Sequence, residues 1–121
     1  MKRIIMLVMM FCFSASLLFA QQPAGDVQVK GVIIDNLSAG SQKPEKLEEF
    51  LKTYTKEYSL QPQSIASGYA IFSNGKLMKF DKISNADIVA FLKLPTNKLQ
   101  VIVECVKTGD LLRLVYIENQ K

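Results

Sequence analysis

A two-residue turn, Asn74-Gly75, constrains the fold of this chain most, because it lies between two short apolar runs. A type I′ hairpin turn needs positive φ at both central residues, and asparagine and glycine tolerate that conformation best. Residues of roughly 66–73 and 76–81 are therefore predicted to pair as antiparallel strands. Gly68 and Ala70 give one side of the first strand only small side chains, which would allow another strand or a bound chain to approach closely. We favour tight packing inside a closed barrel.

A second hairpin is predicted near the C-terminus, where the apolar runs 98–107 and 111–118 are joined by Thr108-Gly109-Asp110. Both runs are mostly apolar on both faces, so at least part of this hairpin is expected to be covered on both sides. Cys105 shares one strand face with three aliphatic residues of its run. This position predicts a buried, inert thiol.

The N-terminal half of the domain is predicted to be a strand, a loop and a helix. Residues 27–35 form the strand, and Gly31 in its middle indicates a bend, a bulge or a close backbone approach. Residues 36–43 read as a loop, and a helix is expected from Pro44 to about residue 58. Its apolar residues recur at helical spacing and predict a stripe that covers the core. The stripe consists of Leu47, Phe50, Leu51, Tyr54 and Tyr58.

A shorter helix is predicted between the two hairpins. Ser84 is expected to cap its N-terminus, with Asp87 completing a pair that resembles a capping box. Ile83 and Ile88 are placed to form a hydrophobic staple across the first turn. Pro95 is expected to end the helix.

The order of these elements is strand, long helical connection, hairpin, short helix, hairpin. Five strands with a helix between the third and fourth is the order of the oligonucleotide/oligosaccharide-binding (OB) barrel. We therefore predict a mainly β fold with two helices, built as a small five-stranded OB-like barrel. An open α+β antiparallel sheet with both helices on one face fits the same order. Closure is favoured because Gly31 and strands with two apolar faces would fit poorly in a half-exposed sheet.

The N-terminal residues have the order of a secretory signal peptide, with Lys2 and Arg3 followed by an apolar run over 4–20. Cleavage is expected between Ala20 and Gln21. An uncleaved membrane anchor is the alternative, since the run is close to the shortest length that spans a bilayer. The protein is therefore predicted to be exported, to the periplasm or beyond the cell. Membrane contact is expected only through the signal segment before cleavage.

After cleavage, the chain is predicted to consist of a flexible leader at 21–26 and a single domain at 27–121. The net charge of the whole chain is +4, and Lys2 and Arg3 belong to the signal segment. Such a mild balance argues against nucleic-acid binding, which usually shows a strongly basic face. Cys105 would then be the only cysteine, so no disulfide can form within the domain and its core must stabilise it.

The hairpin sequence SGYAIFSNGKLMKFD, followed by a capped helix and the run KLQVIVECVKTGDLLRLVYI, resembles a group of small exported bacterial proteins of unassigned function. Their pattern runs SGYG, a strand, DGK with an aromatic residue, KFD, a helix and a closing hairpin around GD. The resemblance covers about residues 28–118 and implies a barrel-like fold and export, but no reaction. Members often carry cysteines after a Val-Ile-Asp strand end, where this chain has Ser38-Ala39-Gly40. No metal-binding or disulfide role is therefore carried over.

The chain contains no histidine, so the commonest general base and metal ligand at neutral pH is missing. The stretch from Ser73 to Lys76 matches the S-x-x-K motif of penicillin-recognising enzymes, in which the motif opens a helix. Here Asn-Gly predicts a hairpin turn at the same place. We therefore predict no catalytic residue, no metal site and no cofactor.

Six residues are candidate ligand contacts: Asp35, Tyr69, Lys79, Asp81, Arg113 and Tyr116. The two aspartates lie at strand ends and could meet at one rim of the barrel to hold calcium, although solvated strand ends and turn caps are the favoured explanation. The other four offer the aromatic and cationic groups that such barrels use to bind chains. Strand alternation places both tyrosines with aliphatic neighbours, which favours core or rim positions.

Together these features predict a non-enzymatic exported module whose barrel face or loop rim binds a peptide, a glycan or a partner protein. Two alternatives stay open: an enzyme that uses carboxylate, lysine and tyrosine groups, and an assembly subunit that attaches through a sheet edge. A deep pocket with convergent ionisable groups would favour the enzyme. Shallow aromatic exposure would favour the binder, and an unpaired apolar edge strand the subunit.

Overall fold

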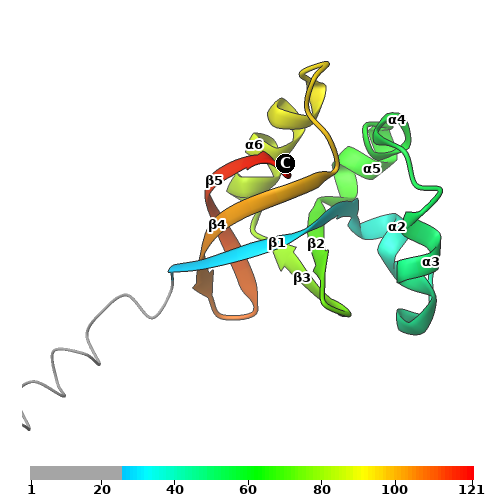
Figure 1. The fold of residues 1–121 in the computed structure, drawn as a ribbon, viewed down its shortest axis with the longest axis horizontal. Helices are drawn as coiled ribbons and strands as arrows, with labels where there is room; N and C mark the ends of the chain where they lie inside the picture. Colours follow the sequence, from blue (N-terminus) through cyan, green and yellow to red (C-terminus); the bar gives the residue numbers. More distant parts are fainter. Residues whose placement is uncertain (1–25) are drawn as a thin grey trace, which may run out of the picture.

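The computed structural model describes residues 26–121 (Figure 1). The predicted signal peptide, with its cut between Ala20 and Gln21, lies outside these residues, as does most of the predicted leader. The strands are β1 (Asp26–Asp35), β2 (Tyr69–Ser73), β3 (Lys76–Phe80), β4 (Gln100–Thr108) and β5 (Leu111–Asn119). The helices are α2 (Asn36–Gly40), the 3-10 turn η1 (Pro44–Lys46), α3 (Leu47–Leu51), α4 (Lys56–Ser59), α5 (Pro62–Ser67) and α6 (Lys82–Lys93).

All five strands lie in one sheet in the order β1-β2-β3-β5-β4, and β1 also pairs with β4. The long strand β1 pairs antiparallel with β4 over residues 26–32 and with β2 over 32–35. Only β3 and β5 run parallel, through two residue pairs. The prediction of a mainly β fold with five strands is confirmed, with 40% strand and 36% helix. The prediction of two helices is wrong, since the described chain has five α-helices.

Both predicted hairpins form. Asn74 has φ 50° and Gly75 φ 77°, the positive values that a type I′ turn requires. β2 begins at Tyr69, later than expected, because α5 extends to Ser67 and Gly68 is its C-cap. The β4–β5 hairpin turns at Gly109-Asp110, where Gly109 has φ 66°.

Gly31 marks a close backbone approach, as predicted. It lies where β1 passes from β4 to β2, and a Cβ atom at this position would overlap the carbonyl oxygen of Phe72. The same Cβ atom would lie 2.9 Å from Ile71 Cγ1. A side chain therefore cannot be accommodated unless β1 and β2 separate.

The main core fills the space between the strands and α6. Alternate residues of the strands point inward, and α6 contributes Ile88 and Leu92. The buried members are Ile33, Tyr69, Ile71, Phe80, Ile88, Leu92, Leu99, Val101, Val103, Cys105 and Leu112. Cys105 is fully buried here, and burial raises the pKa of its thiol to about 11. The predicted burial of this thiol is confirmed.

A second core lies on the outer side of β1 and β2, under the helical connection. Ile34 and Ala70 from the strands pack against Ala39 and Leu47 from the helices. Phe50, Leu51 and Tyr54 pack against this cluster and are half-buried. The side of β2 at Ala70 is therefore covered by the chain's own helices, and Figure 1 shows α2 and α3 beside the end of β1.

The long helix expected from Pro44 does not form as one element. It begins at Pro44 as predicted, but the helical residues end at Leu51 and start again at Lys56. Thr55 adopts an extended conformation and accepts a hydrogen bond from the Tyr58 amide, which caps α4 as a new helix. The loop expected at 36–43 is also partly wrong, because Asp35 caps the short helix α2.

Helix α6 starts earlier than predicted because Asp81, not Ser84, is its N-cap. The Asp81 carboxylate accepts the Ser84 amide at 2.9 Å, and the Ser84 hydroxyl turns inward to accept the Leu114 amide at 2.7 Å. Ile83 is 66% exposed, so the expected hydrophobic staple between Ile83 and Ile88 does not form. The helix ends at Lys93, before Pro95, as predicted.

The outer face of β5 is exposed around Val115 and Tyr116, so this part of the hairpin is not covered on both sides. A register shift between Glu104 and Cys105 places Tyr116 opposite Glu104 and Leu114 opposite Cys105. Val115 and Tyr116 are therefore both exposed, at 59% and 54%. Simple alternation, which grouped Tyr116 with the inward-facing Leu112 and Leu114, fails at this bulge.

Between residues 26 and 121, no helix combines the length and the apolar character that crossing a bilayer requires.

Candidate ligand-binding site

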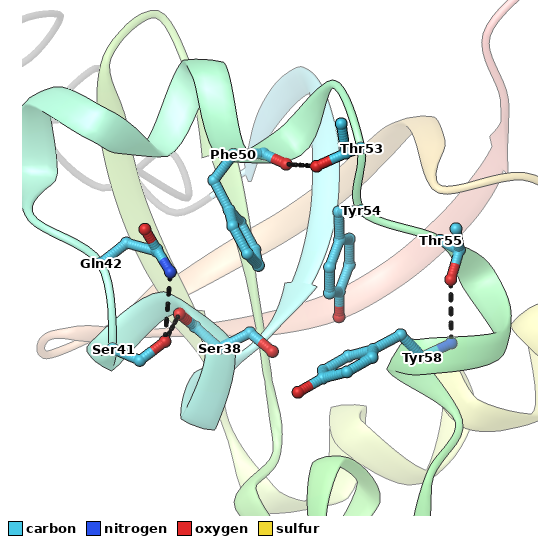
Figure 2. A pocket seen from close by; sticks show the side chains of 8 residues that line it. All are labelled: Ser38, Ser41, Gln42, Phe50, Thr53, Tyr54, Thr55 and Tyr58. Carbon is cyan, nitrogen blue, oxygen red and sulfur yellow. Dashed lines mark hydrogen bonds between the residues drawn. The ribbon is translucent and has the colours of Figure 1, made fainter.

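A pocket of about 310 Å³ opens in the helical connection between β1 and β2 (Figure 2). Its polar lining comes from α2 and from the links on either side of the helices: Ser38, Ser41, Gln42, Thr53 and Thr55. Three aromatic residues complete it: Phe50, Tyr54 and Tyr58. Every one of these side chains is uncharged. The pocket can therefore offer hydrogen bonds and ring surfaces, but it offers no ionic partner.

The three rings pack against one another in sequence along one side of the pocket. The centroids of Phe50 and Tyr54 are 5.6 Å apart with the rings tilted by 40°. Those of Tyr54 and Tyr58 are 6.0 Å apart at 61°, an edge-to-face arrangement. Tyr58 is the outermost ring and is 47% exposed. Its surface is available to a molecule that enters from solvent.

Tyr54 is held in place from behind by Asp35. The Tyr54 hydroxyl donates a hydrogen bond to the fully buried Asp35 carboxylate and accepts one from the Asp35 amide at 3.0 Å. Burial, reinforced by the hydrogen bond to Asp35, raises the pKa of Tyr54 well above its ordinary value. The phenol therefore stays protonated and acts as a fixed donor to Asp35.

The second oxygen of the Asp35 carboxylate accepts the Ser38 amide at 3.0 Å, which caps α2 and places the Ser38 side chain at the pocket. Ser38 is 4% exposed, and its hydroxyl oxygen has no hydrogen-bond partner within the described residues. Figure 2 shows this hydroxyl pointing toward the space beside the Tyr54 and Tyr58 rings. A buried polar atom without a partner is uncommon in native proteins, because leaving it unsatisfied costs free energy.

The other polar side chains of the pocket are partly engaged with the backbone. The Ser41 hydroxyl donates to the Ser38 carbonyl at 2.8 Å, and the Thr53 hydroxyl donates to the Phe50 carbonyl at 3.2 Å. The Gln42 amide nitrogen lies 3.5 Å from the Ser41 oxygen. Each hydroxyl oxygen that donates in this way still has acceptor capacity toward the pocket.

The structure does not bring the six sequence-predicted residues together. Asp35 and Asp81 each cap a different helix, α2 and α6, in the role of turn caps. Asp81 also pairs with Arg113, with 2.9 Å between Nε and the carboxylate. Within residues 26–121, no group of three or more possible metal-binding side chains is found. Of the six, Asp35 alone adjoins the pocket, and it lies behind the ring wall.

Tyr69, Lys79 and Tyr116 lie apart from the pocket lining. Tyr69 is buried in the main core and donates to the Ser59 carbonyl at 2.6 Å, and burial raises its pKa to about 12. Lys79 is exposed on β3. The exposed Tyr116 on β5 donates to the Glu118 carboxylate at 3.1 Å.

Sequence reasoning missed Ser38 and assigned the aromatic residues to a core stripe. Phe50 and Tyr54 do pack on the second core, but Tyr54 and Tyr58 also present ring surface to the pocket. One signal was available in the sequence. Polar Thr53 and Thr55 interrupt the stripe around Tyr54, and such β-branched hydroxyl residues favour a helix end or cap over a continuous helix.

Comparison of the chain with protein-family models, with curated proteins and with solved structures finds no match.

Proposed function

We propose that this chain is an exported, non-enzymatic binding module with an OB-like barrel, and that the pocket in its β1–β2 connection holds the ligand. The observation that carries the proposal is the buried Ser38 hydroxyl, which faces the pocket and has no hydrogen-bond partner in the described part of the chain. Its desolvation is offset once a ligand supplies the missing hydrogen bond. The candidate ligands are a glycan, a peptide or a side chain of a partner protein.

The OB-like assignment is supported by the pairing order. Each strand has two partners, the strand order is circular, and the helix α6 follows β3. An open sheet would leave two strands with a single partner. In OB folds, the β1–β2 connection is one of the loops that bind ligands. The pocket lies in the corresponding connection of this chain.

A binding role is favoured over catalysis by the chemistry of the lining. An enzyme without histidine would need carboxylate, lysine or tyrosine groups that exchange protons within reach of a substrate. The residues lining the pocket are uncharged, and Tyr54 is held as a protonated donor. Attachment through a sheet edge has less support, because each strand of the described sheet has two partners, although β5 pairs with β3 only at Leu111 and Leu112.

Export is inferred from the N-terminal sequence and from the resemblance to small exported bacterial proteins. The test is to express the full chain in a bacterium with a general secretion system and to sequence the N-terminus of the protein recovered from the periplasm. A mature chain that starts at Gln21 is expected. If the chain instead stays uncleaved in the membrane fraction, its N-terminal segment is a membrane anchor and not a cleaved signal peptide.

The binding role is tested by amide NMR of the purified chain titrated with pooled neutral glycans and with pooled short peptides. A ligand in the pocket is expected to shift the amide signals of residues 38–42 and 53–58. Shifts confined to the exposed face of β4 and β5 would instead place the ligand on the barrel. If neither pool shifts any amide, the binding function is wrong.

A further inference from the structure

We infer that the ligand of this pocket is a neutral glycan, with one uncharged sugar ring stacked against Tyr58 and hydrogen-bonded by the Ser38 hydroxyl. The inference rests on the proposed binding function and selects among its three candidate ligands. It is carried by the charge, the hydrogen-bonding capacity, the ring geometry and the size of the pocket.

The charge of the pocket excludes ligands that need an ionic partner. The carboxylate behind the ring wall, Asp35, already accepts the Tyr54 hydroxyl with one oxygen and the Ser38 amide with the other. The lining itself contains no cation. A phosphate, an acidic sugar or a peptide terminus would therefore give up its hydration without gaining a charged contact.

The hydrogen-bonding capacity fits hydroxyl groups. The Ser38 hydroxyl makes no hydrogen bond within residues 26–121, which leaves its proton and its acceptor positions uncommitted. A sugar hydroxyl is also donor and acceptor at once, so it can satisfy this group in either direction. A purely apolar ligand would bury the hydroxyl further and leave it unpaired, at a cost in affinity.

The aromatic wall supplies the other half of sugar recognition. The faces of aromatic rings carry negative partial charge and attract the weakly positive C–H bonds of a sugar ring. Tyr58 is about half exposed and offers the ring surface, and it packs edge-to-face on Tyr54, which is fixed by its two contacts with Asp35. A platform that is ordered before binding loses little conformational entropy when the ligand arrives.

A peptide fits this pocket less well. Peptides bind small β domains most readily by adding a strand to an unpaired sheet edge. The pocket is lined by side chains from helices and their links, and it includes no strand residue.

The size of the pocket suits one sugar ring, with room for a second beside it. Its volume of about 310 Å³ lies at the lower end of the range for small-molecule sites. A second hollow of about 330 Å³ shares Gln42, Phe50 and Thr53 with the pocket, and Lys46 and Glu49 complete its lining. Two linked hollows of this size match a disaccharide or the end of a longer glycan.

The test is amide NMR of the purified chain with N-acetylglucosamine, glucose, chitobiose and cellobiose as neutral probes. Glucuronic acid and a capped tri-alanine peptide are the charged and peptide counterparts. Concentrations up to about 50 mM detect millimolar affinity. At least one neutral sugar is expected to shift the amides of residues 38–42 and 53–58 in a saturable way, and its disaccharide to bind more tightly.

Two variants test the assigned contacts. Ser38→Ala is expected to weaken the sugar by about 3- to 10-fold, the effect of one neutral hydrogen bond. Tyr58→Ala is expected to weaken it by about tenfold, while Tyr58→Phe keeps the ring and most of the affinity. Tyr116→Ala, which removes a similarly exposed tyrosine from β5, is the matched control and should leave the affinity unchanged.

The outcomes separate the two proposals. If glucuronic acid or the peptide shifts the pocket amides and no neutral sugar does, the assignment of a neutral glycan as the ligand is wrong, but the proposed binding function stands. Sugar binding that is unaffected by Ser38→Ala and Tyr58→Ala overturns the assigned contacts. If no probe shifts the pocket amides, both the glycan and the pocket as a binding site are wrong. Dispersed amide spectra of both variants establish that they are folded.

Discussion

Asp35 and Tyr54 show how one buried pair can serve the fold and the site together. The residues are 19 positions apart, and their side chains meet because the helical connection folds back over β1. The pair fixes the outer end of β1, the start of α2 and the ring wall of the pocket. Few changes in this chain should therefore affect both stability and binding as strongly as a change at Tyr54.

Replacing Tyr54 by phenylalanine is expected to lower the free energy of unfolding by about 1–3 kcal/mol, because the buried Asp35 carboxylate loses a donor and its amide loses an acceptor. Chemical denaturation of the wild-type and variant chains measures the difference. Tyr58→Phe, which also removes one tyrosine hydroxyl from the pocket, should change stability by less than about 0.5 kcal/mol. Equal losses of stability from the two substitutions would contradict a structural role for the Asp35–Tyr54 pair.

Asp81 makes the stability of the chain sensitive to acid. Hydrogen bonding by Ser84, from its side chain and its amide, and pairing with Arg113 hold the pKa of Asp81 below its ordinary value. The carboxylate therefore contributes stability above the unfolded-state pKa of about 3.9. This contribution is lost as the pH falls through the lower, folded pKa.

Asp81→Asn is expected to flatten the fall in unfolding free energy below about pH 4, because asparagine still caps a helix but carries no charge to lose. Urea denaturation of both chains from pH 2.5 to 7 measures this. Asp87→Asn changes the net charge equally on the same helix and should keep the wild-type fall. If Asp87→Asn flattened the profile as much as Asp81→Asn, general charge and not the Asp81 contacts would explain the acid sensitivity.

At the scale of elements, local signals located the two hairpins, the helical start at Pro44 and the end of α6, whereas the predicted continuity of the helix over residues 44–58 is wrong. The Asn-Gly turn and Gly31 were interpreted correctly because each depends on backbone geometry that few residues allow. The helix expected over residues 44–58 is broken at Thr55, although its apolar spacing continues through Tyr58. Periodicity records which side chains face the core, and two short helices can satisfy it as well as one long helix.

Gly31→Ala is expected to lower the free energy of unfolding by about 1–3 kcal/mol or more, because the new methyl group would collide with the Phe72 carbonyl across the β1–β2 pair. Thermal or chemical denaturation measures the loss. Gly40→Ala is the matched control, since a Cβ atom there meets nothing within 4 Å. We expect it to change stability by no more than about 0.5 kcal/mol. Comparable losses at both positions would contradict the close approach at Gly31.

At the scale of the whole molecule, two cores share the strands β1 and β2. Ile33 points to the interior between the strands and α6, and Ile34 points to the helical connection. Neither core can be exposed without disturbing these strands. Unfolding of the described domain is therefore expected to be cooperative, and the buried Cys105 provides a probe of it.

In a chain that carries Cys12→Ser, so that a single thiol remains, Cys105 is expected to resist a thiol reagent under native conditions and to react fully in denaturant. Burial excludes the reagent and raises the thiol pKa to about 11. Ellman's reagent measures the rate. The rate should rise with urea in parallel with the loss of circular dichroism. Rapid labelling of the native chain would show that β4 opens locally.

The sequence by itself determined the features that depend on local geometry or on strict alternation. These are the two hairpins, the tight position at Gly31, the end of α6 before Pro95 and the burial of Cys105. Each follows from the φ angles that a residue tolerates or from the two faces of a strand. The sequence also placed Asp35 and Asp81 at strand ends, and turn caps were the favoured explanation for both.

Only the tertiary structure decided which side chains form the site. Tyr116 left the core face because a bulge shifted the register of β4 and β5. Ser38 and Tyr58 became pocket residues because the broken helical connection folds against β1 and β2, where Asp35 fixes Tyr54. Such placements depend on contacts between residues far apart in the chain. Spacing along the sequence does not encode these contacts, because the same apolar pattern is satisfied by several ways of packing short helices on a sheet.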